Sequence, residues 1–117
     1  MLEIMFEKQK QLQTKLGTLE KIKNPQDKQA YINQMVLALV EESIEILRET
    51  PYKNPDFVQF GWKKNQLGNE DKYKDEIVDL FHFMMNLSIV VGMTSTEFFE
   101  RYCKKNKINH ERKNNKY

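Results

Sequence analysis

The chain is 117 residues long, with 39% hydrophobic and 31% charged residues, four Gly and three Pro. This length allows a single domain, residues 1–117, and the composition is that of a soluble helical protein rather than a disordered one. The formal net charge of +2 is too small to indicate a surface that binds nucleic acid throughout, so no nucleic-acid partner is expected.

The compartment follows from what the chain lacks. Cys103 is its one cysteine, which excludes a disulfide within the chain and is typical of a reducing compartment. The N-terminal stretch MLEIMFEKQKQLQ has no apolar centre of the kind found in signal peptides, and no apolar run approaches the roughly 20 residues of a membrane span. We expect a cytoplasmic protein that does not enter a membrane.

Two amphipathic helices are predicted in the first half of the chain. Residues 2 to about 22 place apolar side chains near helical spacing, and the pair Asn24-Pro25 ends this helix. Pro25, with Asp27 just after it, is a typical helix start. The second helix is therefore predicted to run from there to about Glu49.

The second half begins with an irregular connection. Residues 51–71 carry two Pro, two Gly and several aromatic side chains, and a connection this long in a small domain is often functional. The next helix, about 72–91, is apolar on nearly every side, so we expect it to be central and covered by other helices or by a second subunit. Gly92 ends it.

A last helix is predicted to follow Gly92 closely. Thr94 caps it, with Ser95 as the alternative, and Glu97 three residues after Thr94 completes a capping box. The helix continues into the basic end HERKNNKY. The predicted fold is therefore all-α with four helices.

Two pairs of carboxylates stand out on these helices. Glu42 and Glu45 are three residues apart on the second helix, and Glu76 and Asp79 have the same spacing on the third, so each pair shares one side of its helix. Their neighbours are apolar, and buried carboxylates protonate or lose several kcal/mol unless a cation holds them. Oxygen ligands of this kind favour Mg²⁺, with Mn²⁺ as the other candidate.

Each feature also has an ordinary structural interpretation. Acidic pairs at this spacing are most often solvated helix surface, and Glu41 is interpreted in that way. His82, three residues beyond Asp79, is either a satisfied core histidine or a partner that orients a metal ligand, and the second is favoured. Trp62 either packs beneath the connection or stacks on a base. The basic end is either a solvated or nucleic-acid-binding tail or a phosphate-binding face.

The acidic pattern resembles that of a known superfamily. Glu42-x-x-Glu45 followed about thirty residues later by Glu76-x-x-Asp79 resembles the ExxE and ExxD signature of the all-α nucleoside triphosphate pyrophosphohydrolases, which include MazG-like enzymes and dimeric dUTPases. The stretches VDLFHFMMNLSIVVGM and EFFERYCKKNKINHERKNNKY are similar to helices of dimeric dUTPases and of related phage dCTP/dUTP pyrophosphatases. The opening MFEKQKQL and the segment around Trp62 also resemble that group.

The resemblance implies a role for each candidate residue. The metal ligands are Glu42, Glu45, Glu76 and Asp79. Glu49, one turn beyond Glu45, holds a metal or orients the attacking water, so it is a catalytic candidate. The phosphate-binding residues are Tyr102, Lys105, Asn109 and Arg112, of which Lys105 and Arg112 also count as catalytic because they neutralise charge in the transition state. Gln9 and Trp62 bind the base.

The resemblance also implies an activity and an assembly. The expected reaction is Mg²⁺-dependent hydrolysis of dUTP or dCTP to the monophosphate and pyrophosphate, in the host cytoplasm if a phage encodes the chain. A purine or modified deoxynucleotide is the alternative substrate, and a non-enzymatic helical module with a nucleic-acid-contacting tail is the alternative of another class. Full-length dimeric dUTPases have more helices than this chain can hold. We therefore expect a MazG-like or dimeric-dUTPase-like bundle completed by oligomerisation, as a homodimer or a dimer of dimers.

Overall fold

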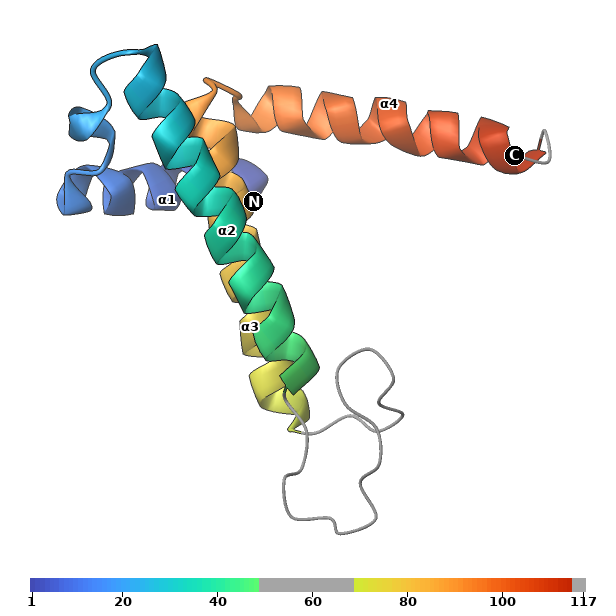
Figure 1. Ribbon diagram of the computed structural model, residues 1–117. Helices are drawn as coiled ribbons and strands as arrows, with labels where there is room; N and C mark the ends of the chain where they lie inside the picture. Colours follow the sequence, from blue (N-terminus) through green and yellow to red (C-terminus); the bar gives the residue numbers. More distant parts are fainter. Residues whose placement is uncertain (49–68, 115–117) are drawn as a thin grey trace, which may run out of the picture.

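The computed structural model describes residues 1–48 and 69–114, which form helices joined by short turns (Figure 1). The elements in chain order are α1 (Leu2–Leu16), the short 3-10 helix η1 (Leu19–Lys21), α2 (Pro25–Arg48), α3 (Glu70–Val90) and α4 (Ser95–Asn114). The part of the chain that the structure describes contains no strand, which confirms the predicted all-α class.

The first helix ends earlier than predicted. Gly17 adopts a left-handed conformation with φ of 68°, and its N–H bonds the Thr14 carbonyl at 3.1 Å while the Thr18 N–H bonds the Gln13 carbonyl at 3.3 Å. This pair of bonds closes a helix at a glycine. The prediction of one helix to about residue 22 was therefore wrong, and η1 takes up the last part of that stretch.

Side-chain caps set the starts of the other helices. The Asn24 carboxamide accepts the Asp27 N–H at 2.8 Å, so α2 begins at Pro25 as predicted. Asn69 caps α3 in the same way, through the Lys72 N–H at 3.1 Å. Thr94 accepts the Glu97 N–H at 3.1 Å, which confirms Thr94 as the cap of α4.

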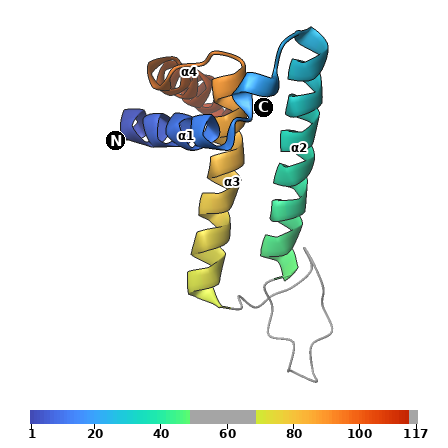
Figure 2. The ribbon, with the colours of Figure 1, turned by 90° about the vertical axis from the view of Figure 1, so that its left-hand side faces the viewer.

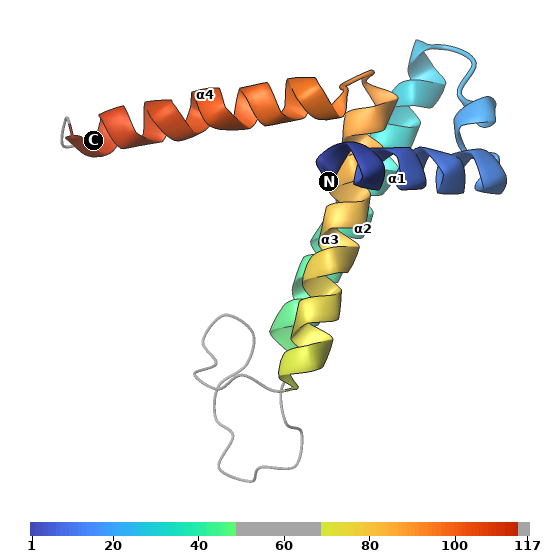
Figure 3. The same ribbon diagram turned by 180° about the vertical axis from the view of Figure 1, so that it is seen from behind.

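α2 and α3 form a pair of helices, and α1 and α4 meet this pair at one end. α2 and α3 run antiparallel and side by side, and α1 lies across one end of α3 (Figures 1 and 2). At that same end Gly92, with φ of 76°, ends α3, and α4 leaves at 109° to it. Figure 3 shows α4 projecting away from the other helices. Because α3 packs against both α1 and α2, it is the central helix that its apolar sequence predicts.

The buried core is small and lies where α1, α3 and α4 meet. Phe6, Met85 and Ile89 are buried together, and Phe98 at the start of α4 packs on them. The rings of Phe6 and Phe98 meet edge to face, with centroids 5.8 Å apart. α4 is therefore anchored to the core through its first turn.

The described helices do not individually meet the requirements of a membrane span. None of them is by itself long and apolar enough to cross a bilayer; only α3 and α4 taken together, which are bent by 109°, have the length and composition.

Candidate functional site

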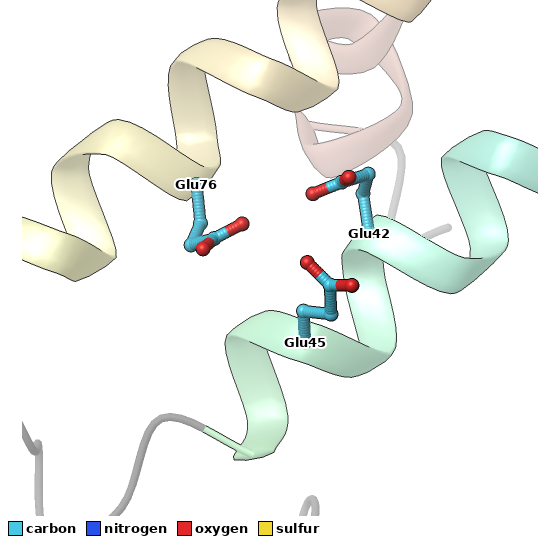
Figure 4. A group of neighbouring side chains, drawn as sticks. All are labelled: Glu42, Glu45 and Glu76. Carbon is cyan, nitrogen blue, oxygen red and sulfur yellow. The ribbon is translucent and has the colours of Figure 1, made fainter.

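Three of the predicted carboxylates converge between α2 and α3. Glu42 and Glu45 lie one turn apart on α2, and Glu76 faces them from α3 (Figure 4). Each of the three offers an oxygen that lies within 4.8 Å of those of the other two. The antiparallel packing of α2 on α3 therefore gathers, in one place, acids that are far apart in the sequence.

Two of these carboxylates each have an oxygen that no described residue stabilises. Within the described residues, Glu42 Oε2 and Glu76 Oε2 are buried and have no hydrogen-bond partner. Partial burial raises the pKa of Glu42 to about 7, and the neighbouring carboxylates of Glu76 and Glu45 add to the shift. Glu42 therefore keeps a proton below about pH 7 in the metal-free chain.

A divalent cation fits this arrangement. A cation would replace the proton and satisfy both buried oxygens, and an all-oxygen set of carboxylates suits Mg²⁺ or Mn²⁺. The residues that could hold such an ion are thus Glu42, Glu45 and Glu76.

The other residues that the sequence assigned to this site lie outside the three-carboxylate cluster or outside the described residues. Asp79, half-buried one turn beyond Glu76, is not among the described side chains that share the three-carboxylate cluster. His82 is exposed on α3, and Glu41 is exposed as its interpretation as surface charge predicts. Glu49 and Trp62 lie outside the described residues. The roles assigned to Asp79, His82, Glu49 and Trp62 stay predictions.

Gln9, the predicted base-binding residue, belongs to a buried amide network. Its side chain is 5% exposed, and its Nε2 donates to Asn86 Oδ1 at 2.6 Å. Gln13 Nε2 donates to the same oxygen at 2.8 Å, and the Tyr31 hydroxyl donates to Gln13 Oε1 at 3.2 Å. Burial raises the pKa of Tyr31, because a phenolate there would lose its water. The network ties α1, α2 and α3 together.

The sequence predicted a functional role only for Gln9, and not for the other three members of this network, Gln13, Tyr31 and Asn86. A signal was present for Asn86, since an amide within the apolar run MMNLSIV must find partners when its helix is buried. Gln13 and Tyr31 carried no comparable signal. Asn86 lies ten residues along α3 from Glu76, or about 15 Å, so the network and the carboxylates mark two ends of one helix pair.

A hollow of about 400 Å³ opens beside this network. It lies between η1 and the first half of α2, and its lining includes Thr18, Ile22, Tyr31 and Met35. Tyr31 therefore both lines the hollow and bonds the buried amide of Gln13.

The predicted phosphate-binding residues lie apart from the carboxylates within one chain. Tyr102, Lys105, Asn109 and Arg112 are all exposed on α4. α4 leaves from one end of the α2 and α3 pair, whereas the carboxylates lie toward the other end (Figures 1 and 4). The single chain does not bring the two sets together.

Similarity to known proteins was found at the level of sequence. The model of a family described as dUTPase matches residues 1–100. Over 55 residues the chain is 42% identical to the dCTP pyrophosphatase of Enterobacteria phage T4, a segment that covers 45% of this chain and 32% of that protein. The match thus spans about a third of the length of that relative. No solved structure matches.

Proposed function

Because the family model matches residues 1–100, the chain belongs to the dUTPase family, and we propose that it hydrolyses dUTP or dCTP to the monophosphate and pyrophosphate. The observation that carries the proposal is the cluster of Glu42, Glu45 and Glu76, two of which have a buried oxygen without a hydrogen-bond donor. Similarity to a phage dCTP pyrophosphatase supports a pyrimidine substrate.

The metal in this proposal is Mg²⁺, with Mn²⁺ as a substitute. Glu42, Glu45 and Glu76 would hold it, with Asp79 on the next turn of α3 as a further ligand. When bound, such an ion neutralises negative charge, polarises the phosphorus and makes water a better nucleophile. The four carboxylates would fix its position.

The protein's own groups then position the reactants. Glu49, one turn beyond Glu45, is proposed to accept a hydrogen bond from the attacking water. Lys105 and Arg112 are proposed to bind the phosphates and to neutralise the charge that grows on the leaving oxygens. Tyr102 and Asn109, on the same side of α4, add neutral hydrogen bonds.

Base selection is proposed to depend on Gln9 and Trp62. A carboxamide has both a hydrogen-bond donor and a hydrogen-bond acceptor. Cytosine carries an amino donor at the position where uracil carries a carbonyl acceptor, so the orientation of a carboxamide can distinguish the two bases. Asn86 Oδ1 accepts from Gln9 Nε2, which orients the Gln9 amide. The roughly 15 Å between Asn86 and Glu76 is comparable with the length of an extended nucleoside triphosphate.

The test is pyrophosphate release from each of the common deoxynucleoside triphosphates and dUTP, with and without Mg²⁺. We expect dUTP or dCTP to be the best substrate, and we expect chelation to abolish turnover. Glu76→Gln is the inactive variant, and Glu41→Gln, which changes an exposed acid on the same helix turn as Glu42, is the matched control.

Other outcomes would support the alternatives. A preference for a purine or modified nucleotide would keep the chemistry and change the substrate. No hydrolysis of any nucleotide, together with salt-dependent binding of DNA through the basic end, would overturn the proposal in favour of a binding module.

A further inference from the structure

The hollow between η1 and the first half of α2 lies away from the three-carboxylate cluster. Its volume of about 400 Å³ falls within the range of roughly 300–1,000 Å³ that is usual for small-molecule sites. η1 and the start of α2 are at the end of the α2 and α3 pair opposite to the cluster (Figures 2 and 4). Of the lining residues, Met35 is nearest to Glu42 along α2, and the helix between them is about 10 Å long. The hollow is therefore a separate concave site.

The polar lining of the hollow carries both signs of charge. Lys21 comes from η1 and Asp27 from the first turn of α2, and Gln34 adds a carboxamide. Among the described residues, none bonds the side chain of Lys21 or Gln34, and the Asp27 carboxylate accepts only the Lys23 N–H, at 3.1 Å through Oδ2. The cation, one carboxylate oxygen and the carboxamide are thus available to a ligand.

Three other lining residues also contact the buried amide network. The Tyr31 side chain is 8% exposed, and its hydroxyl donates to Gln13 Oε1 at 3.2 Å. Thr18 Oγ1 donates to the Gln13 carbonyl at 3.2 Å, and Met35 Sδ accepts from Asn86 Nδ2 at 3.6 Å. A ligand in the hollow would therefore touch residues that hold the network in place.

These lining groups select a ligand with an anionic group, a flat ring and an amino group. Lys21 attracts an anion such as phosphate. The carboxylate of Asp27 only accepts hydrogen bonds, so it requires a donor such as an exocyclic amine. Tyr31, Ile22 and Met35 offer apolar surface to a planar ring. A nucleoside monophosphate whose base carries an amino group has all three features, whereas a uracil nucleotide has a carbonyl in place of the amine.

We propose that the hollow between η1 and α2 is a second nucleotide site, which binds a nucleoside monophosphate with an amino-bearing base through Lys21, Asp27 and Gln34. dCMP, the monophosphate released from dCTP, belongs to this class. The choice of dCMP as the ligand rests on the proposed function, but its binding in the hollow requires neither the metal nor turnover.

Isothermal titration calorimetry of the full chain with dCMP in chelator tests this site. We expect one dCMP to bind per chain, because the hollow contains none of the proposed metal ligands. dUMP lacks the amine and deoxycytidine lacks the phosphate, so each loses a charge-assisted hydrogen bond. Both should bind at least about 10-fold more weakly than dCMP. Equal affinities of dCMP and dUMP would contradict the predicted contact with Asp27.

Substitutions at the rim locate the bound dCMP. Lys21→Ala should weaken binding at least about 10-fold. Lys23→Ala is the matched control, because Lys23 is an exposed cation two residues away that does not line the hollow. Lys105→Ala should also leave the affinity unchanged. A loss of binding in Lys105→Ala, but not in Lys21→Ala, would place dCMP on α4 and overturn the proposal.

Filling the hollow gives a second test of position. Ala30 lines the hollow on an exposed part of α2, so Ala30→Trp should abolish dCMP binding while circular dichroism shows the same helix content. Lys28→Trp adds the same bulk to an exposed residue outside the lining and should bind as wild type does. Unchanged binding in folded Ala30→Trp, or no binding by wild type at millimolar dCMP, would refute the second site. Pyrophosphate release would still test the proposed function separately.

The amide network reports occupancy of the hollow. In NMR spectra of wild type, the side-chain NH₂ signals of Gln13 and Asn86 should shift when dCMP is added, because Tyr31 and Met35 contact both the ligand and these amides. The same addition to Ala30→Trp should leave these signals in place. Binding of dCMP without a shift of either amide in wild type would locate the nucleotide elsewhere and overturn the proposal.

Discussion

Glu42 on α2 and Glu76 on α3 bring carboxylate oxygens within 4.8 Å of each other, and each has an Oε2 that is buried without a hydrogen-bond partner in the described structure. Two like charges in such positions repel each other and lose hydration. The site is therefore unfavourable for the metal-free protein.

Neutralising one of these carboxylates is expected to separate activity from stability. Glu76→Gln or Glu42→Gln should lower kcat by at least about 100-fold, because a metal ligand is lost. The Tm of the metal-free protein should stay the same or rise, because a partly buried, repelled charge is removed. Calorimetry in chelator and pyrophosphate release in Mg²⁺ measure the two effects.

Substitution of the exposed Glu41 is the control for the Glu76→Gln and Glu42→Gln variants. Glu41→Gln makes the same chemical change one residue away from Glu42 on a solvated side of α2, so it should alter neither quantity. Full activity in Glu76→Gln would contradict the assignment of the site.

The pKa of Glu42 predicts how the stability of the metal-free protein depends on pH. This pKa is raised to about 7 in the folded chain from 4.5 as its ordinary value, so between these values the folded state binds more protons than the unfolded state. The free energy of unfolding contributed by Glu42 is therefore greatest below pH 4.5 and is lost as pH rises through 7. Urea denaturation in chelator from pH 5 to 8.5 should show this loss in wild type.

Glu42→Gln tests whether Glu42 causes that dependence. The variant cannot titrate at this position, so its stability should fall less over the same pH range. Wild-type Mg²⁺ binding should also release protons near pH 6, and this release should diminish above pH 8. An identical pH dependence in wild type and variant would show that other groups are responsible.

The described structure shows why some features were predictable from sequence and others were not. α2 begins at Pro25 and α4 at Ser95 because the side chains of Asn24 and Thr94 each accept a hydrogen bond from the backbone N–H three residues later. The cause of each helix start therefore lies in the local sequence. The early end of α1 also has a local cause in Gly17, but the apolar spacing beyond it obscured that signal. Local chemistry therefore accounts for most of the element boundaries.

The site depends on features that no local pattern contains. The three-residue spacing places Glu42 beside Glu45, but only the register of α2 against α3 decides that Glu76 meets them and that Asp79 lies outside the cluster. In the same way, the sequence predicted that Gln9 contacts a base. Its hydrogen bond to Asn86 depends instead on the crossing of α1 over α3. Packing between helices, rather than sequence spacing, determines these contacts.

Replacing Asn86 is expected to destabilise the fold. Asn86→Ala would remove the acceptor for the Gln9 and Gln13 amides, and a buried donor left without a partner costs about 1–3 kcal/mol. We expect a loss of about 2–4 kcal/mol in the free energy of unfolding, part of it from the cavity, measured by urea denaturation. The ratio of dUTP to dCTP turnover should also change, because the Gln9 amide would no longer be held.

Ser88→Ala provides the comparison for this change. Ser88 is also buried on α3, but its hydroxyl bonds the Met84 carbonyl of its own helix, so its loss leaves no long-range partner unsatisfied. The cost should be below about 1 kcal/mol, with unchanged base preference. Equal losses from the two substitutions would show that the amide network contributes no specific stability.

The last prediction concerns assembly, and it follows from the exposed apolar side chains of α2 and α3. If a second copy covers them, a folded monomer gains stability from association, and the Tm should rise with protein concentration by mass action. Scanning calorimetry between about 1 and 100 µM should show an increase of several degrees, with light scattering at about twice 14.1 kDa. An interface able to do this should bury about 2,000 Å² or more and be largely apolar. A concentration-independent Tm together with a compact, active species of 14.1 kDa would contradict the paired architecture, because the phosphate-binding candidates on α4 lie apart from the carboxylates within one chain.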